Sequence, residues 1–90
     1  MDRASLKLPA WADRDVVDDA IAAAGLRLAG VLPTANGGVQ LVAMSPDRQT
    51  KATFVRTVPI RFEEVVLEGT HVEELGHVIR ASLARGTPGA

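Results

Sequence analysis

Cysteine is absent from these 90 residues, and one tryptophan and two phenylalanines are the only aromatic residues. Without cysteine the chain cannot form disulfides, thiol nucleophiles, iron–sulfur clusters or thiolate zinc sites. The scarcity of aromatic side chains leaves little surface on which single-stranded bases could stack. These absences exclude disulfide-stabilised and cysteine-dependent proteins, and they leave a core built from small and branched aliphatic side chains.

Neither sign of charge is in excess, because ten basic and eleven acidic residues give a net charge of −1. This balance argues against a disordered charged tail and against a protein that depends overall on phosphate or membrane electrostatics. No stretch approaches the ~18 consecutive apolar residues of a membrane span. Charged residues also interrupt the start of the chain, where a signal peptide would lie. We therefore expect a soluble, cytoplasmic protein with a single domain over residues 1–90.

Two segments have the apolar spacing of an amphipathic helix. The first spans residues 13–24, with Asp13 as its N-cap and Gly25 placed to end it. The second begins at Thr70-His71-Val72-Glu73, a capping box in which a hydroxyl and a carboxylate each satisfy a free backbone amide, and it ends before Gly86. A helix is thus expected near each end of the chain.

Between the helices the apolar period changes to two, which indicates β-strands. The expected strands are 26–32, 39–44 and 51–58, joined by a hairpin turn at Asn36-Gly37 and a type I turn at Ser45-Pro46-Asp47-Arg48. Residues 60–67 form either a fourth strand or a loop with one helical turn, and we favour the strand. Residues 1–10 are an N-terminal arm or an edge strand, and residues 87–90 are a flexible tail.

The predicted fold class is α+β, with the order α-β-β-β-(β)-α and an antiparallel three- or four-stranded sheet packed against two helices. This order resembles that of the double-stranded RNA-binding domain. That family places lysine-rich sequence at the start of its second helix, whereas the equivalent residues here end in Glu73 and Glu74, which would repel phosphate. The resemblance therefore extends to topology alone.

The predicted hairpin carries apolar residues on both faces. Strict alternation places Leu26, Leu28, Leu32, Val39, Leu41 and Ala43 on one side and Ala29, Val31, Val42 and Met44 on the other. A second apolar face of this size is more than a small monomer usually exposes. Three explanations are open: the opening residues cover this second face, the helices lie on opposite faces of the sheet, or a partner binds to it. The single tryptophan, Trp11, either packs against the fold or anchors an interface, so the candidate interface comprises Trp11, Ala29, Val31, Val42 and Met44.

Catalytic and ligand-binding motifs are missing from the sequence. The last helix carries His71, Glu73, Glu74 and His77, which offer two-ligand pairs on one face but no HExxH arrangement. No serine lies in a Gly-x-Ser-x-Gly elbow, and no GxxxxGK sequence is present. The adjacent carboxylate pairs diverge rather than converge on a cleft. We expect no catalytic residue, no metal and no cofactor.

Charge is distributed unevenly in the second half of the chain. Residues 48–61 carry Arg48, Lys51, Arg56 and Arg61 without an acid, and residues 63–74 carry five glutamates. The basic segment supports an alternative function as a nucleic-acid-binding protein, unless the acidic segment neutralises its charge across neighbouring strands or between subunits.

The function predicted from the sequence is a small non-catalytic protein-interaction module of bacterial or phage type, acting as an adaptor, regulator or inhibitor. It would act through a sheet face or edge, with another protein or with a second copy as a homodimer, and not on a membrane.

Overall fold

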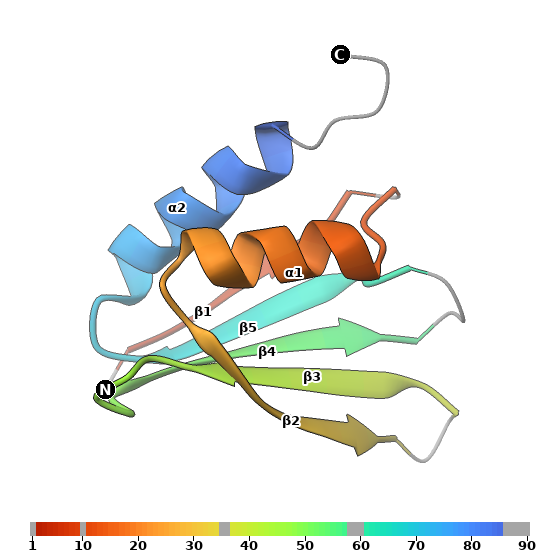
Figure 1. Cartoon of the computed structure of the whole chain (residues 1–90), viewed down its shortest axis with the longest axis horizontal. Helices are drawn as coiled ribbons and strands as arrows, with labels where there is room; N and C mark the ends of the chain where they lie inside the picture. Colours follow the sequence, from red (N-terminus) through yellow and green to blue (C-terminus); the bar gives the residue numbers. More distant parts are fainter. Residues whose placement is uncertain (1, 10, 35–36, 58–60, 86–90) are drawn as a thin grey trace.

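The computed structural model places two helices over the same face of a five-stranded antiparallel sheet (Figure 1). It describes residues 2–9, 11–34, 37–57 and 61–85. The elements in chain order are β1 (Asp2–Lys7), α1 (Arg14–Ala23), β2 (Arg27–Pro33), β3 (Val39–Met44), β4 (Thr50–Arg56), β5 (Glu64–Gly69) and α2 (Val72–Arg85). The sheet order is β1-β5-β4-β3-β2. The α+β class and the single small domain are therefore confirmed.

The predicted number of strands and their order are wrong at the N-terminus. Residues at the start of the chain form β1, which pairs antiparallel with β5, so the sheet has five strands rather than three or four. The physical reason is the period of two in β1, where Ala4 and Leu6 alternate with exposed polar side chains. The order β-α-β-β-β-β-α also removes the likeness to the double-stranded RNA-binding domain. The preference for a strand in the uncertain segment is confirmed by β5.

The two helices begin differently. The Asp13 carboxylate accepts a hydrogen bond from the Val16 N–H at 3.1 Å, which confirms the predicted cap of α1, and Gly25 follows with φ +71°. At α2 the predicted capping box is wrong, because the helix starts at Val72. The Thr70 hydroxyl lies 3.2 Å from the Thr50 hydroxyl, which also donates to the Thr70 carbonyl at 2.6 Å. Thr70 thus ties the end of β5 to β4 instead of capping the helix.

The turn between β3 and β4 lies at the predicted residues, Ser45–Arg48, since the Arg48 N–H donates to the Ser45 carbonyl at 2.9 Å. Two backbone bonds close the loop between β2 and β3: the Thr34 N–H donates to the Gly38 carbonyl at 3.1 Å, and the Gly37 N–H donates to the Thr34 carbonyl at 3.2 Å. Asn36 itself lies outside the described residues, as do residues 58–60 and the predicted tail at 87–90.

The sheet has a near face, which the helices cover, and a far face. The core on the near face is formed by six large, fully buried side chains together with smaller residues; the six are Phe54, Leu41, Leu67, Ile79, Val17 and Val65. Trp11 is half-buried and packs against this core. Within the described residues, β1 is part of the sheet and both helices lie on one side of it (Figure 1), so neither β1 nor a helix covers the far face.

A β-bulge in β2 changes which residues share a face. The register shifts between Leu28 and Gly30, so Leu28 pairs with Ala43 while Gly30 pairs with Val42. After the bulge, Val31 lies on the near face and Leu32 on the far face, the reverse of the strict alternation expected from the sequence. One extra residue in the strand is enough to exchange the faces of all residues that follow it.

We expect Gly69→Ala to lower the free energy of unfolding by about 2–3 kcal/mol. Gly69 has φ +117°, and an added Cβ would overlap the backbone carbonyl oxygen of Gln49. Gly30→Ala is the matched control, because nothing lies within 4 Å of a Cβ added there. Urea denaturation followed by circular dichroism measures both variants. An equal effect of the two substitutions would contradict the steric argument.

Candidate protein-interaction surfaces

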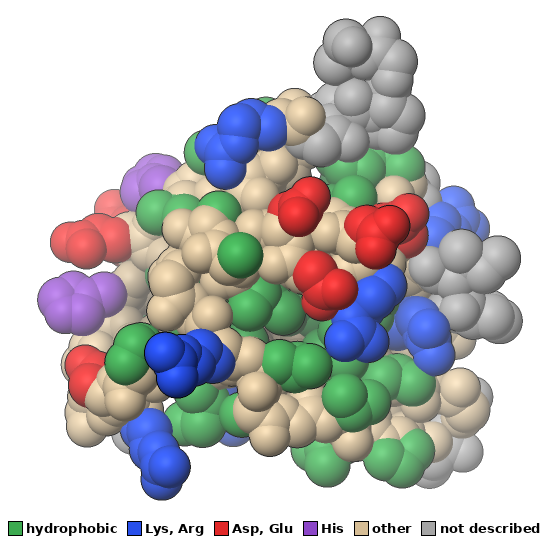
Figure 2. Space-filling view, in the orientation of Figure 1, with side chains coloured by type: hydrophobic (Ala, Val, Ile, Leu, Met, Phe, Trp, Pro, Cys, Tyr) green, Lys and Arg blue, Asp and Glu red, His purple; other side chains and the backbone are tan. Residues whose placement is uncertain are grey.

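Strand β2 carries most of the exposed large hydrophobic side chains of the described residues. Leu28, Val31 and Leu32 are 42%, 53% and 52% exposed, and the only other such residue among those described is Val78 on α2. Leu28 and Val31 lie on the near face and Leu32 on the far face, so the edge of the sheet is apolar on both sides. Figure 2 shows hydrophobic side chains gathered along the margin formed by β2 and β3. We call Leu28, Val31 and Leu32 the β2 patch.

The backbone edge of β2 is poorly suited to pairing with a further strand, although its side chains are exposed. The hydrogen bond between Thr34 and Gly38 sets the alternation of the ladder, so the Val31 N–H points away from β3. Pro33 has no N–H to offer, and the bulge beside Gly30 interrupts the regular spacing. Bulges and prolines are two of the devices that limit edge-to-edge pairing. Contact at β2 is therefore favoured through side chains.

The interface residues predicted from the sequence do not form one surface. Ala29 and Val31 are exposed on β2, whereas Val42 and Met44 are half-buried on β3. Val42 and Met44 belong to the far face, and the bulge places Val31 on the opposite one. Trp11 packs near the start of α1. The structure instead groups Val31 with two residues that strict alternation had assigned to the covered face, Leu28 and Leu32.

The far face has an apolar centre between two charged rows. The cross-strand registers give the rows Arg3-Glu68-Lys51-Met44-Arg27, Ser5-Val66-Thr53-Val42-Gly30 and Lys7-Glu64-Val55-Gln40-Leu32. The charges lie mainly on β1, β5 and β4, and the apolar side chains mainly toward β3 and β2. The second apolar face predicted from the sequence is thus limited to the part of the far face toward β3 and β2.

The four basic residues of the alternative function are dispersed. Arg48 lies in the turn before β4, and Lys51 lies on the far face with its Nζ 3.8 Å from a Glu68 carboxylate oxygen. Arg56 lies on the near face at the other end of β4, 5.8 Å above the Phe62 ring, and Arg61 follows in the loop before β5. Residues at odd separation on a strand face opposite ways, so Lys51 and Arg56 lie on opposite faces of the sheet.

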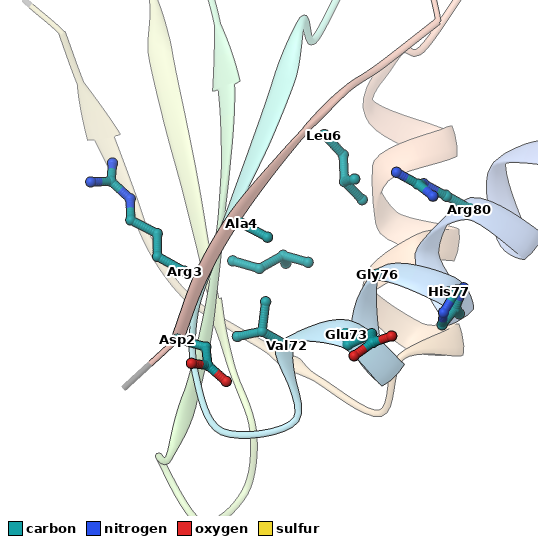
Figure 3. Close-up of a pocket in the computed structure, with 10 residues that line it drawn as sticks. Asp2, Arg3, Ala4, Leu6, Val72, Glu73, Gly76, His77 and Arg80 are labelled. Carbon is teal, nitrogen blue, oxygen red and sulfur yellow. The ribbon is translucent and has the colours of Figure 1, made fainter.

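A groove lies between β1 and α2, with a volume of about 460 Å³. Figure 3 shows Ala4, Leu6 and Val72 toward its interior, while the Arg3 side chain extends away from α2. The groove is also lined by five charged or titratable residues: Asp2, Arg3, Glu73, His77 and Arg80. An apolar floor with a few polar groups on its rim is typical of a binding cleft.

The titratable side chains of α2 form only isolated pairs. His71 Nδ1 lies 3.8 Å from a Glu74 carboxylate oxygen, and both side chains are largely exposed. Within residues 2–9, 11–34, 37–57 and 61–85, no three His, Asp or Glu side chains are grouped so that they could hold a metal ion. Neither described helix has the length and apolar character needed to cross a membrane.

Comparison with known proteins identifies no relative. No protein-family model, no curated protein and no solved structure matches this chain. Function is therefore inferred from the chain's own surfaces: the β2 patch, the far face and the groove between β1 and α2.

We expect the pKa of Asp47 to lie below its ordinary value of 3.8, because the Ser45 hydroxyl and then the Gln49 N–H donate to its carboxylate. Since the folded pKa is lowered, the charged carboxylate stabilises the turn above the ordinary pKa, and this contribution is lost as the pH falls through the lowered value. Side-chain NMR titration measures it.

Ser45→Ala should raise the pKa of Asp47 toward its ordinary value, because it removes the first of the two donors. Ser5→Ala on β1 is the matched control and should leave the Asp47 titration unchanged. An unaltered midpoint in Ser45→Ala would show that the hydroxyl does not hold the carboxylate in its charged form.

Proposed function

We propose that this protein is a non-catalytic protein-interaction module that associates with a second copy of itself through the β2 patch. The observation that carries the proposal is the exposure of three large aliphatic side chains, Leu28, Val31 and Leu32, on one edge strand. Clusters of this kind usually mark interaction sites in small soluble proteins. Adaptor, regulator and inhibitor proteins all act through such contacts.

Burial of the patch supplies the driving force. Full burial of a valine or leucine side chain is worth about 1.5–3 kcal/mol, and these side chains are about half exposed, so each contributes roughly 1 kcal/mol when covered. In a two-fold dimer every residue of the patch is buried twice, once from each copy. The sum is large enough to offset part of the entropy lost on association.

A second copy fits the patch better than a strongly charged partner would. Within β2 the only charged residue is Arg27, so two patches can meet without bringing like charges together at their centre. The net charge of −1 also leaves little long-range repulsion between two molecules. Since Pro33 and the bulge limit backbone pairing, the contact is formed by side chains from both faces of the strand.

Sedimentation equilibrium or size-exclusion chromatography with light scattering tests the proposal. The wild-type chain should give a concentration-dependent mass rising toward twice the 9.5 kDa of one chain. The double variant Val31→Lys with Leu32→Lys should raise the dimer dissociation constant at least about tenfold, because it places charges in the contact. A wild-type chain that stays monomeric at millimolar concentration would contradict self-association.

Ala81→Lys is the matched control for this experiment. It adds the same charge at an exposed position of α2, away from β2, and should leave the association unchanged. Circular dichroism of all variants separates a lost contact from a lost fold. If Ala81→Lys weakens the dimer as much as the double variant does, added charge alone explains the effect and the β2 patch is not the interface.

A further inference from the structure

We propose that the groove between β1 and α2 binds an extended peptide segment of a partner protein. The peptide would add to β1 as an antiparallel strand, with an acidic residue toward Arg80 and a basic residue toward Asp2 and Glu73. This site lies at the opposite edge of the sheet from the β2 patch, so the inference is independent of self-association.

The free edge of β1 is regular over its whole length. The Leu8 N–H donates to the Glu63 carbonyl at 2.8 Å, which continues the β1–β5 register by one residue. Even-numbered residues of β1 therefore bond to β5, and the N–H and C=O groups of Arg3, Ser5 and Lys7 point outward. Strand β1 contains no proline, and its pairing with β5 has no register shift. It lacks both devices that limit pairing at β2.

The groove has room for side chains because Gly76 faces β1. A Cβ added at Gly76 would lie 3.7 Å from a Leu67 methyl and 3.8 Å from a Leu6 methyl, so glycine leaves space where α2 passes β1. Ala4, another small residue, lines the groove from β1. The alternate residues of an added strand would point to this floor. A β-branched or other modest aliphatic side chain opposite Ala4 fits this space.

Charges at the two ends of the groove differ in sign. Asp2 pairs with Gly69 at the end of β5, and α2 begins three residues later, which places Glu73 at the Asp2 end. Arg80 lies two turns further along α2, at the Leu6 end (Figure 3). On the near face one end is therefore acidic and the other basic, since the Arg3 side chain at the Asp2 end extends away from α2 (Figure 3). A peptide that is complementary to both ends carries an acidic residue on one side of its central apolar residue and a basic residue on the other.

The spacing follows from strand geometry. Asp2, Ala4 and Leu6 are the near-face residues of β1, and they span roughly 13 Å at about 3.3 Å per residue. An antiparallel peptide opposite Leu6, Ala4 and Asp2 then has the pattern acidic–x–aliphatic–x–basic from its N-terminus to its C-terminus. The two intervening residues lie opposite Ser5 and Arg3 and form the backbone hydrogen bonds.

The probe is the capped peptide acetyl-Gly-Glu-Thr-Val-Thr-Lys-Gly-amide, and its control has the Glu and Lys exchanged. Both have the same composition and net charge. NMR shift mapping and fluorescence anisotropy should show that the first binds at β1 and α2 at least about tenfold more tightly than the second. Equal affinities, tighter binding of the exchanged peptide, or shifts centred on Val31 would overturn the proposal.

Two further variants of the protein distinguish strand addition at β1 from nonspecific electrostatic attraction. Arg80→Glu together with Glu73→Arg should reverse the preference, so that the exchanged peptide binds more tightly. Ser5→Pro removes an outward N–H without touching the β1–β5 ladder and should weaken binding at least about tenfold. N-methylation of either threonine in the peptide makes the same test without altering the protein. Undiminished binding by the methylated peptides would overturn strand addition.

The variant Val31→Lys with Leu32→Lys separates this site from the β2 patch. Because β1 and β2 are opposite edges, this variant should bind the peptide with the wild-type affinity even when its dimer is lost. Loss of peptide binding in this variant would place the peptide at β2 and overturn the assignment to the groove. A monomeric wild-type chain that still binds the peptide would contradict the dimer alone.

Discussion

The antiparallel pairing of β1 with β5 is the constraint on which the rest of the structure depends. It makes the sheet five-stranded and turns the opening residues into an edge strand. It also fixes the Asp2 end of the sheet beside Gly69, where the chain turns into α2. Because both helices lie over the same face, the far face carries no helix, and β1 and β2 are the two edge strands of the sheet (Figure 1).

The two edge strands of the sheet offer different kinds of contact. Strand β2 presents aliphatic side chains on both faces but a backbone interrupted by its bulge and Pro33. Strand β1 presents charged side chains on the far face but a regular backbone and a groove lined by α2. Burial of apolar area favours association at the first edge, and hydrogen bonding to a free strand favours it at the second. A single domain of this size can thus carry two contacts that do not compete for one surface.

One ion pair joins the basic and the acidic segment of the second half of the chain across the sheet. Lys51 and Glu68 come from the basic and acidic segments of the sequence, and they meet as neighbours on β4 and β5. The register continues this row to Arg3 on β1. Exposed pairs of this kind contribute little to stability. This pair places a carboxylate beside one of the four basic residues of the segment.

The local periodicity of the sequence determined α1, α2 and the strands β2, β3 and β4, because each depends on neighbours within a few residues. For β5 it favoured a strand over a loop with one helical turn. The N-cap Asp13, the helix-ending Gly25 and the turn at Ser45–Arg48 could be predicted for the same reason. Tertiary structure decided three features: that the opening residues pair with a strand about sixty positions away, that a bulge exchanges the faces of Val31 and Leu32, and that Thr70 bonds to Thr50 rather than capping α2. Each of these depends on a partner distant in the chain, and a pattern of period two or 3.6 carries no information about which strand will lie beside it.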